Sequence, residues 1–445
     1  MSPHRDLEPI GRVTDSRWDR RDPWALASVT LVAALLRIVR VADPRTLVFD
    51  EIYYAKDACW YATRSMSLCG IDAEQTQVHP PLGKWLLSLG IEVFGYDSLG
   101  WRIAAALAGS LTVALVYILA RRALASFLGA IVASGMLAID FLHFVQSRVA
   151  MLDVFTTLFG VASVLCLVLD REQLLRGERR DRAAGGLATW RPWRLAAGAA
   201  AGAAVASKWS GILFVVTALA LAVSWELAAR ERPRRWGRVV REEGASIALA
   251  LVLMPAAVYV IAYAGRLEGD LAALPWSGGS WIRSFWDRQL FMFDFHRGLE
   301  ATHPYQSPPW SWLLLKRPVS YYFDKTEAGG YLEVVALGSP FVWWASALAL
   351  VAILVLWARR RDGWGPEGMI LTGFAFNYLP WLVLARGRSA VFLFYLLPAV
   401  PFMCLALGYI PARLAEAPWA SGAAVAFAAV CLALFVFYYP VLAKV

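Results

Sequence analysis

The fold of this protein is decided by residues 24–56, which read WALASVTLVAALLRIVRVADPRTLVFDEIYYAK. The first part of the stretch is a predominantly apolar run of the length that an α-helix needs to cross a lipid bilayer. The second part carries two adjacent carboxylates, Asp50 and Glu51, where such a helix returns the chain to water. The polar loop continues to Val-His-Pro-Pro-Leu-Gly-Lys at 78–84. The stretch predicts a membrane helix followed by a loop in which chemistry should be sought first.

The composition is that of a polytopic membrane protein. Apolar residues make up 59% of the 445 residues and charged residues 17%, whereas soluble domains carry roughly a quarter charged residues. The net charge is +9, but the arginines lie in short clusters between apolar segments. That pattern is typical of cytoplasmic membrane loops, so no nucleic-acid partner is expected.

Apolar segments bounded by Pro, Gly and charge clusters predict an all-α fold with about eleven transmembrane helices. They lie at 24–42, 99–119, 123–143, 150–169, 195–209, 211–229, 245–264, 340–358, 367–385, 390–410 and 418–438. The fifth is rich in Ala and Gly and should pack closely against its neighbours. Residues 1–23 are polar and basic and have no cleavable signal, which predicts a cytoplasmic tail.

The basic clusters predict the orientation of these helices. Arginines precede the first span, follow the second and the eighth, and crowd residues 171–194 and 230–241. Alternate loops are therefore cytoplasmic, and the long loops 43–98 and 265–339 face outward from the plasma (inner) membrane. The predicted parts are the tail 1–23, a catalytic membrane module 24–264 that includes loop 43–98, the outer loop 265–339, and C-terminal helices 340–445.

Two features of the outer loops leave alternatives open. Cys59 and Cys69 either form a disulfide or remain thiols, because nothing in the sequence fixes their separation. The tryptophans of the second loop either form an interfacial belt or cover the site with stacking surfaces.

Ionisable residues collect at the outer edge of the membrane on this topology. A single arginine at a helix end is usually an anchor, but several cations beside a carboxylate pair suit a lipid-phosphate substrate. The residues are Asp50, Glu51, His79, Lys84, Arg102, Arg148, Asp153, Lys208, Arg386, Arg388 and Tyr395. They show no close-spaced metal-ligand motif, so no cofactor is required, although Asp50 and Glu51 with a substrate phosphate could hold Mg²⁺.

The motifs of the first half resemble those of the protein O-mannosyltransferases (GT39), membrane glycosyltransferases of the GT-C class. They are Phe49-Asp50-Glu51 with Tyr53 and Lys56, His79-Pro80-Pro81-Leu82-Gly83-Lys84, Ser147-Arg148 with Leu152-Asp153, and Ser207-Lys208-Trp209-Ser210-Gly211. Pro304-Tyr305-Gln306-Ser307 and Asn377-Tyr378-Leu379-Pro380-Trp381 resemble the bacterial branch. Loop 265–339 is too short for the sugar-binding trefoil inserted in eukaryotic members.

The resemblance implies transfer of mannose, with inversion, from polyprenyl monophosphate mannose to Ser or Thr hydroxyls of polypeptides emerging from the secretion machinery. Asp50 suits the general base, because an alcohol must lose its proton as it attacks. Glu51 is expected to orient sugar hydroxyls or the acceptor.

The remaining candidates are expected to hold the donor or shape the loop. Lys208, Arg148 and Arg102 form the predicted phosphate site, with pairing to Glu51 as the alternative for Arg102. His79, Lys84, Tyr53 and Lys56 position the loop or the acceptor. Asp153 is expected to orient Arg148, and Arg386, Arg388 and Tyr395 are supporting candidates.

Two other functions remain open at this point. One is a GT-C enzyme that transfers aminoarabinose or arabinose from a lipid-linked donor to lipid or polysaccharide. Such an enzyme would likewise need a carboxylate base and cations that bind the donor phosphate. A transporter or flippase is disfavoured, because no internal repeat is visible and the charges lie at one interface rather than at mid-membrane.

Overall fold

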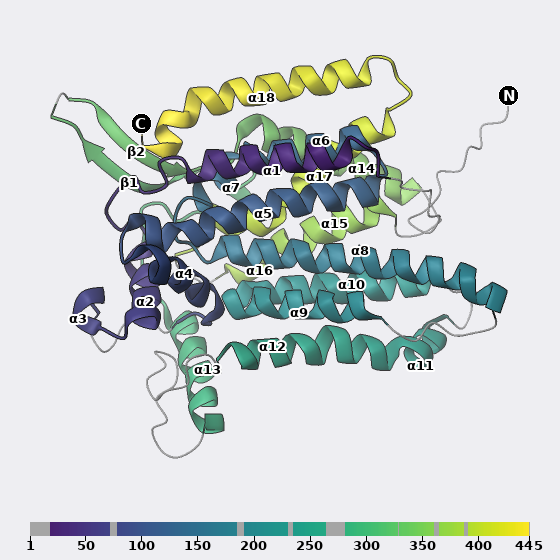
Figure 1. Ribbon diagram of the computed structural model, residues 1–445, viewed down its shortest axis with the longest axis horizontal. Helices are drawn as coiled ribbons and strands as arrows, with labels where there is room; N and C mark the ends of the chain where they lie inside the picture. The colour runs from purple at the N-terminus through teal and green to yellow at the C-terminus, as the bar shows by residue number, and fades with distance from the viewer. Residues whose placement is uncertain are drawn as a thin grey trace.

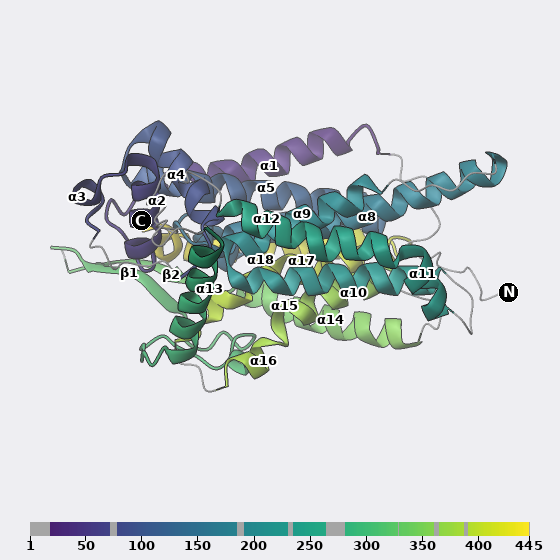
Figure 2. The same cartoon turned by 90° about the horizontal axis from the view of Figure 1, so that it is seen from below.

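The computed structural model describes residues 18–71, 78–184, 191–229, 235–263, 281–327, 329–359, 365–386 and 390–444. Figures 1 and 2 show long helices running side by side in one elongated bundle. The bundle contains α1 (Asp22–Ile38), α5 (Ser98–Leu124), α6 (Phe127–Ala138), α8 (Asp153–Ala184), α9 (Pro192–Ser207), α10 (Ile212–Ala228), α11 (Arg235–Ala248), α12 (Met254–Ala262), α14 (Pro340–Arg359), α15 (Pro366–Tyr378), α17 (Val400–Arg413) and α18 (Ala420–Ala443).

Seven helical stretches in the described ranges are long and apolar enough to cross a membrane. The predicted spans 24–42, 123–143, 195–209 and 367–385 coincide instead with shorter helices of 17, 12, 16 and 13 residues. At α6 the cause is Asp140, whose carboxylate accepts a hydrogen bond from the His143 amide and begins a new helix, α7 (Phe141–Gln146). The protein is multi-pass, and the count of eleven crossings stays a prediction.

Helix α9 packs through its small residues, as its composition predicts. A Cβ atom added at Gly198 would lie 1.6 Å from the carbonyl oxygen of Ala250. One added at Gly202 would lie 2.7 Å from the Cα of Pro255. Only glycine permits this approach of α9 to the helix that runs from α11 to α12.

The described parts of the two long loops contain helices and lie at one end of the bundle. Loop 43–98 contains α2 (Glu51–Thr63), α3 (Met66–Cys69) and α4 (Leu82–Phe94), and the disulfide Cys59–Cys69 ties α2 to α3. Loop 265–339 contains α13 (Trp281–Gly298), which lies at the same end (Figure 1). The opposite end carries the end of α8 and α11.

The prediction of an all-α fold is wrong in one place. Strands β1 (Val319–Lys325) and β2 (Tyr331–Ala336) form an antiparallel hairpin, with Val319 opposite Ala336 and Lys325 opposite Tyr331. Both strands are rich in aromatic and β-branched residues, and Gly329 in the turn has a φ of 83°.

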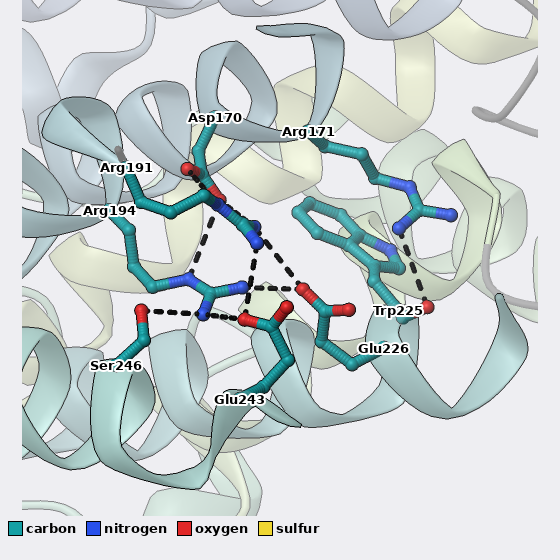
Figure 3. Close-up of polar contacts among 8 residues, drawn as sticks. All are labelled: Asp170, Arg171, Arg191, Arg194, Trp225, Glu226, Glu243 and Ser246. Carbon is teal, nitrogen blue, oxygen red and sulfur yellow. Dashed lines mark hydrogen bonds and ion pairs between the residues drawn. The ribbon is translucent and has the colours of Figure 1, made fainter. Parts of the chain in front are cut away.

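A buried ion network lies at the start of α9, and Figure 3 shows its side chains. Arg194, of which 1% is exposed, donates to Glu226 and, over 2.6 Å, to Glu243. Arg191 donates to Asp170 over 2.8 Å from its Nε. These contacts join four helices, α8, α9, α10 and α11.

Candidate active site

Asp50 occupies the N-cap position of α2 and is directed by an unusual backbone. Phe49, the preceding residue, has a φ of 47°, in the left-handed region that side chains other than glycine rarely adopt. Its ring stacks on Tyr321 of β1 at 4.6 Å and lies 5.6 Å from Phe394. Aromatic residues from the second half of the chain therefore hold the backbone that presents Asp50.

Lys208 and Asp153 form a buried ion pair at the same site. The Lys208 Nζ donates to both carboxylate oxygens of Asp153, over 2.9 and 2.8 Å. Asp153 begins α8, and Lys208 is the extended residue that ends α9. The Nζ also lies 4.8 Å from the ring centroid of Tyr395. Asp153 thus pairs with Lys208 and not with Arg148, which corrects its predicted role.

Asp50 lies within electrostatic reach of this pair. Burial raises the pKa of Asp50 from 3.8 to about 6, the positive charge of Lys208 opposes the rise, and Asp153 adds to it. Tyr54, one helical turn along α2, donates a hydrogen bond of 3.3 Å to the Asp50 carboxylate. The result is a carboxyl group that is ionised at neutral pH yet basic enough to accept a proton.

Arg102 is fully occupied in holding the first loop. Its Nε and Nη2 donate to Glu51 over 2.7 Å each, and its Nη groups also donate to the carbonyls of Val41, Pro44 and Thr46. A guanidinium group has five N–H donors, and these contacts engage all of them. The alternative of a pair with Glu51 is therefore the correct one, and we reassign Arg102 from the phosphate site to loop positioning.

Glu51 is a positioning residue by its contacts. Besides Arg102, it accepts hydrogen bonds from the backbone amides of Val48, at 3.0 Å, and Ala150, at 2.8 Å. It is completely buried. These contacts fix the start of α2, and with it Asp50, against the turn before α8.

Arg148 caps a helix. Its Nη1 donates to the carbonyls of Leu36, Arg37 and Val39, and its Nη2 donates to that of Arg40. These carbonyls are at the C-terminus of α1, where the last turn lacks partners of its own. We therefore reassign Arg148, like Arg102, from the phosphate site to structural support.

The candidates for positioning the loop lie in different surroundings. Lys84 and Asp57 form a buried ion pair of 2.6 Å that joins α4 to α2. Lys56 donates to the Gly70 carbonyl over 3.0 Å at the exposed hairpin closed by the disulfide. The His79 ring lies 5.6 Å from that of Tyr54, beside the base, whereas Tyr53 is 42% exposed.

Of the candidates at 386–395, one lies at the site. Tyr395 contacts Lys208, as described. Arg386 is exposed, and no contact with another described residue places it at the site. Arg388 lies outside the described residues.

Three residues at the site carry no predicted role. Tyr54 could have been found, because it lies four residues after Asp50 on one helical face. Tyr321 accepts a hydrogen bond of 2.7 Å from Gln146 and packs beside the base, but it has no local signal 271 positions away along the chain. The ring centroid of His296 lies 5.2 Å from that of His79 and 5.9 Å from that of Trp209.

In the described part of the chain, no three His, Cys, Asp or Glu side chains come together as metal ligands.

Comparison with known proteins places the chain in a family. The sequence model of the dolichyl-phosphate-mannose-protein mannosyltransferases matches residues 27–265, and that of the C-terminal four-helix membrane region of protein-O-mannosyltransferase matches residues 281–443. The chain is 32% identical over 431 residues to the polyprenol-phosphate-mannose–protein mannosyltransferase of Mycolicibacterium smegmatis, covering 88% of this chain and 82% of the relative.

Solved structures show the same fold. The protein O-mannosyltransferase complex of Saccharomyces cerevisiae, solved with its sugar donor, superposes with a TM-score of 0.76 at 15% identity, covering 98% of this chain and 91% of that chain. ArnT from Cupriavidus metallidurans gives a TM-score of 0.57 at 19% identity, covering 96% and 66%. The fold is GT-C, and the chain belongs to the family of dolichyl-phosphate-mannose-protein mannosyltransferases.

Proposed function

We propose that this protein transfers mannose from polyprenyl monophosphate mannose to Ser or Thr hydroxyls of polypeptides, with inversion at the anomeric carbon. The observation that carries the proposal is the placement of Asp50 beside the buried Lys208–Asp153 pair, at one end of a membrane bundle. The named relative from Mycolicibacterium smegmatis supports the donor and the protein acceptor.

The reaction needs one base and one stabilised leaving group. Asp50 accepts the hydroxyl proton while the acceptor oxygen attacks the anomeric carbon from the face opposite the phosphate. The bond between that carbon and the phosphate oxygen breaks, and the polyprenyl phosphate leaves with the electron pair. Lys208 has three N–H donors, two of which bind Asp153. The third is directed to an oxygen of the leaving phosphate, where charge develops.

Transfer by this route uses no cofactor. The positive charge of Lys208 supplies the stabilisation that Mg²⁺ would otherwise provide. Addition of EDTA is therefore expected to leave the transfer rate unchanged, whereas a loss of rate restored by Mg²⁺ would show that a cation completes the phosphate site.

We further propose that the site faces outward from the plasma membrane and takes polypeptides as they leave the secretion machinery. The arginine-rich segments support this orientation, since Arg191 and Arg194 of the network in Figure 3 lie at the start of α9, whereas Lys208 follows its end. Basic residues are enriched on the cytoplasmic side of membrane proteins. The N-terminus before α1 then lies in the cytoplasm.

The test is transfer of radiolabelled mannose from polyprenyl phosphate to a Thr-rich peptide by the purified protein. Asp50→Asn is expected to lower the rate by about 10²–10⁴-fold, the usual contribution of a general base. Asp324→Asn, which neutralises an exposed carboxylate on β1, is the matched control and should retain the wild-type rate. Near-normal turnover by Asp50→Asn would refute the assignment of the base.

The alternative GT-C function is tested in the same assay. Lipid-linked aminoarabinose and arabinose are offered in place of the mannose donor, with lipid or polysaccharide acceptors. If one of these donors is used and mannose is not, that function replaces ours. If no sugar is transferred while the lipid itself is moved across the bilayer, the protein is a flippase.

A further inference from the structure

A slot of about 380 Å³ lies between α18 and the helices α14 and α17, away from the candidate active site. It is lined by side chains from one stretch of each helix, residues 345–352, 407–414 and 420–427. Tyr395, which contacts Lys208, precedes α17, whereas the slot lies beside the last turns of that helix. The stretch Leu393–Arg413 is long and apolar enough to cross a membrane, so the slot and the active site lie toward opposite leaflets.

The slot exists because the side chains of the two halves of α18 differ in size. In the C-terminal half, the ring of Phe435 lies 5.1 Å from that of Phe144 in α7, and the ring of Tyr438 lies 5.3 Å from that of Phe141. In the N-terminal half, three of the side chains that line the slot are the alanines at 420, 423 and 424. Methyl groups are too short to close the distance that the aromatic rings set, which leaves a gap.

The lining of the slot favours a hydrocarbon ligand. The described residues that line it are all Ala, Val, Leu, Ile, Pro, Phe or Trp. A buried water molecule needs two to four polar partners, which these side chains do not supply. An empty slot would forfeit the van der Waals contacts of its walls. A flexible apolar chain restores those contacts.

The shape of the slot is that of a single chain. On each of the three helices, the first and last lining residues are seven positions apart, which corresponds to about 10 Å. The helices run along the bundle (Figures 1 and 2), so the slot is elongated in the direction of lipid tails. A 10 Å length of a helix with its side chains would occupy roughly 800 Å³, about twice the volume of the slot. An acyl chain therefore fits, whereas a helix of another molecule does not.

The slot is open to the bilayer and has a cation at its end. Leu348 and Trp419, which line it, are 73% and 61% exposed, so a lipid can enter from the side. Arg413, in the last turn of α17, is half-buried and directly precedes the lining residue Leu414. A guanidinium group binds phosphate through paired N–H donors. Tryptophan is enriched at the depth of lipid headgroups.

We propose that this slot binds one phospholipid of the leaflet opposite to the active site, with an acyl chain between α14, α17 and α18 and the phosphate at Arg413. The chain takes the place of the large side chains that the N-terminal half of α18 lacks, and it holds this half of α18 on the bundle. The site is separate from the donor site, so the proposal does not depend on mannose transfer.

The test measures the phospholipid that the purified protein retains. The protein is extracted in a mild detergent, incubated with phosphatidylethanolamine and analysed by native mass spectrometry. Ala424→Phe fills the slot from α18, and Ala352→Phe fills it from α14. Val425→Phe and Val351→Phe are the matched controls, since they add a ring at neighbouring positions that are 66% and 60% exposed.

We expect wild type and both controls to retain one phospholipid more than the filling variants, whose occupancy at this site should fall severalfold. Arg413→Gln should lower the retention of phosphatidylethanolamine severalfold and leave that of diacylglycerol, which has no phosphate, unchanged. The thermal unfolding midpoint of each preparation shows whether it is folded. Because the two filling variants alter different helices, the loss of one fold leaves the other as the test.

Three results would overturn the proposal. Equal retention by wild type and folded filling variants would place the lipid elsewhere on the protein. No retained phospholipid in wild type would show that the slot does not bind one. A dimer that the filling variants convert to monomer would show that side chains of a second copy occupy the slot.

Discussion

The pKa of Asp50 is set by opposing effects of its surroundings. Burial and Asp153 favour its protonated form, and Lys208 and the hydrogen bond from Tyr54 favour the carboxylate, which leaves its pKa at about 6. Only the carboxylate can act as a base. We therefore expect kcat/KM to fall by about tenfold per pH unit below pH about 6, and to be level above it until another group titrates.

A rate profile over the acidic range checks this expectation. Tyr54→Phe removes the hydrogen bond that lowers the pKa of Asp50, so the acid limb of the variant should move to higher pH. A wild-type limb near pH about 4, the range of an unperturbed carboxyl, would contradict the environment described for Asp50.

Lys208 is expected to act on the leaving phosphate and not only to neutralise Asp153. Lys208→Met alone leaves Asp153 buried without its paired cation, which confuses loss of function with loss of structure. The double variant Lys208→Met/Asp153→Asn removes both charges. We expect it to fold as well as wild type while kcat falls by about 10²–10³-fold, the usual cost of one lost charge-stabilising donor.

The measurements are kcat for mannose transfer and the thermal unfolding midpoint of the same preparation. Recovery of the wild-type kcat in the double variant would limit Lys208 to a structural role.

Single functional residues could be predicted from the sequence where an ionisable side chain stands beside an apolar segment. The side chains and carbonyls that each of them contacts were harder to predict. Asp50, Lys208 and Tyr395 could be proposed because charges and motifs are conspicuous beside apolar segments. Arg148 was misassigned because its ligands are main-chain carbonyls, which no sequence pattern marks. For Arg102 the pair with Glu51 was already one of the two alternatives. The partner of Asp153 was missed since the extended backbone at Lys208 cannot be read from its neighbours.

At the scale of elements, apolar runs predict helices well and predict their interruptions poorly. Each predicted span falls on helical structure, yet Asp140 divides one of them and Pro380 follows the end of another. The β-hairpin was missed because the aromatic residues of its loop also fit a membrane belt. The disulfide was left open since the turn that brings Cys59 to Cys69 depends on Ser65 capping α3.

Helices α2 and α4 of the first outer loop are joined by a buried ion pair. Its loss should lower the free energy of unfolding. Lys84 of α4 and Asp57 of α2 are both almost completely buried. Lys84→Met removes the cation and should destabilise the protein by about 3–5 kcal/mol, the usual cost of breaking a buried pair by removing one partner. Lys84→Met/Asp57→Leu should recover most of that loss, because neither member of the pair is then left buried without the other.

Thermal unfolding in detergent, followed by circular dichroism, measures the effect. A single variant that unfolds at the wild-type temperature would show that the Lys84–Asp57 pair does not hold α2 on α4.

At the scale of the whole molecule, the bundle holds one buried group of charges at the active site and another, without a proposed catalytic role, farther along its helices. The ion network of Arg191 and Arg194 (Figure 3) joins four helices at the start of α9, whereas Lys208 of the active site follows the end of that helix. Arg194→Ala removes a buried cation shared by Glu226 and Glu243, so it should destabilise the protein by about 3 kcal/mol. Arg241→Ala is the matched control, since Arg241 forms an exposed pair with Glu242, and such pairs contribute less than about 1 kcal/mol.

Below its unfolding temperature, Arg194→Ala should transfer mannose with the wild-type kcat and KM per folded molecule, because α8 and α9 keep their contacts at Asp153 and Lys208. An equal fall in kcat and stability would instead show that the four helices transmit the packing of one end to the active site at the other.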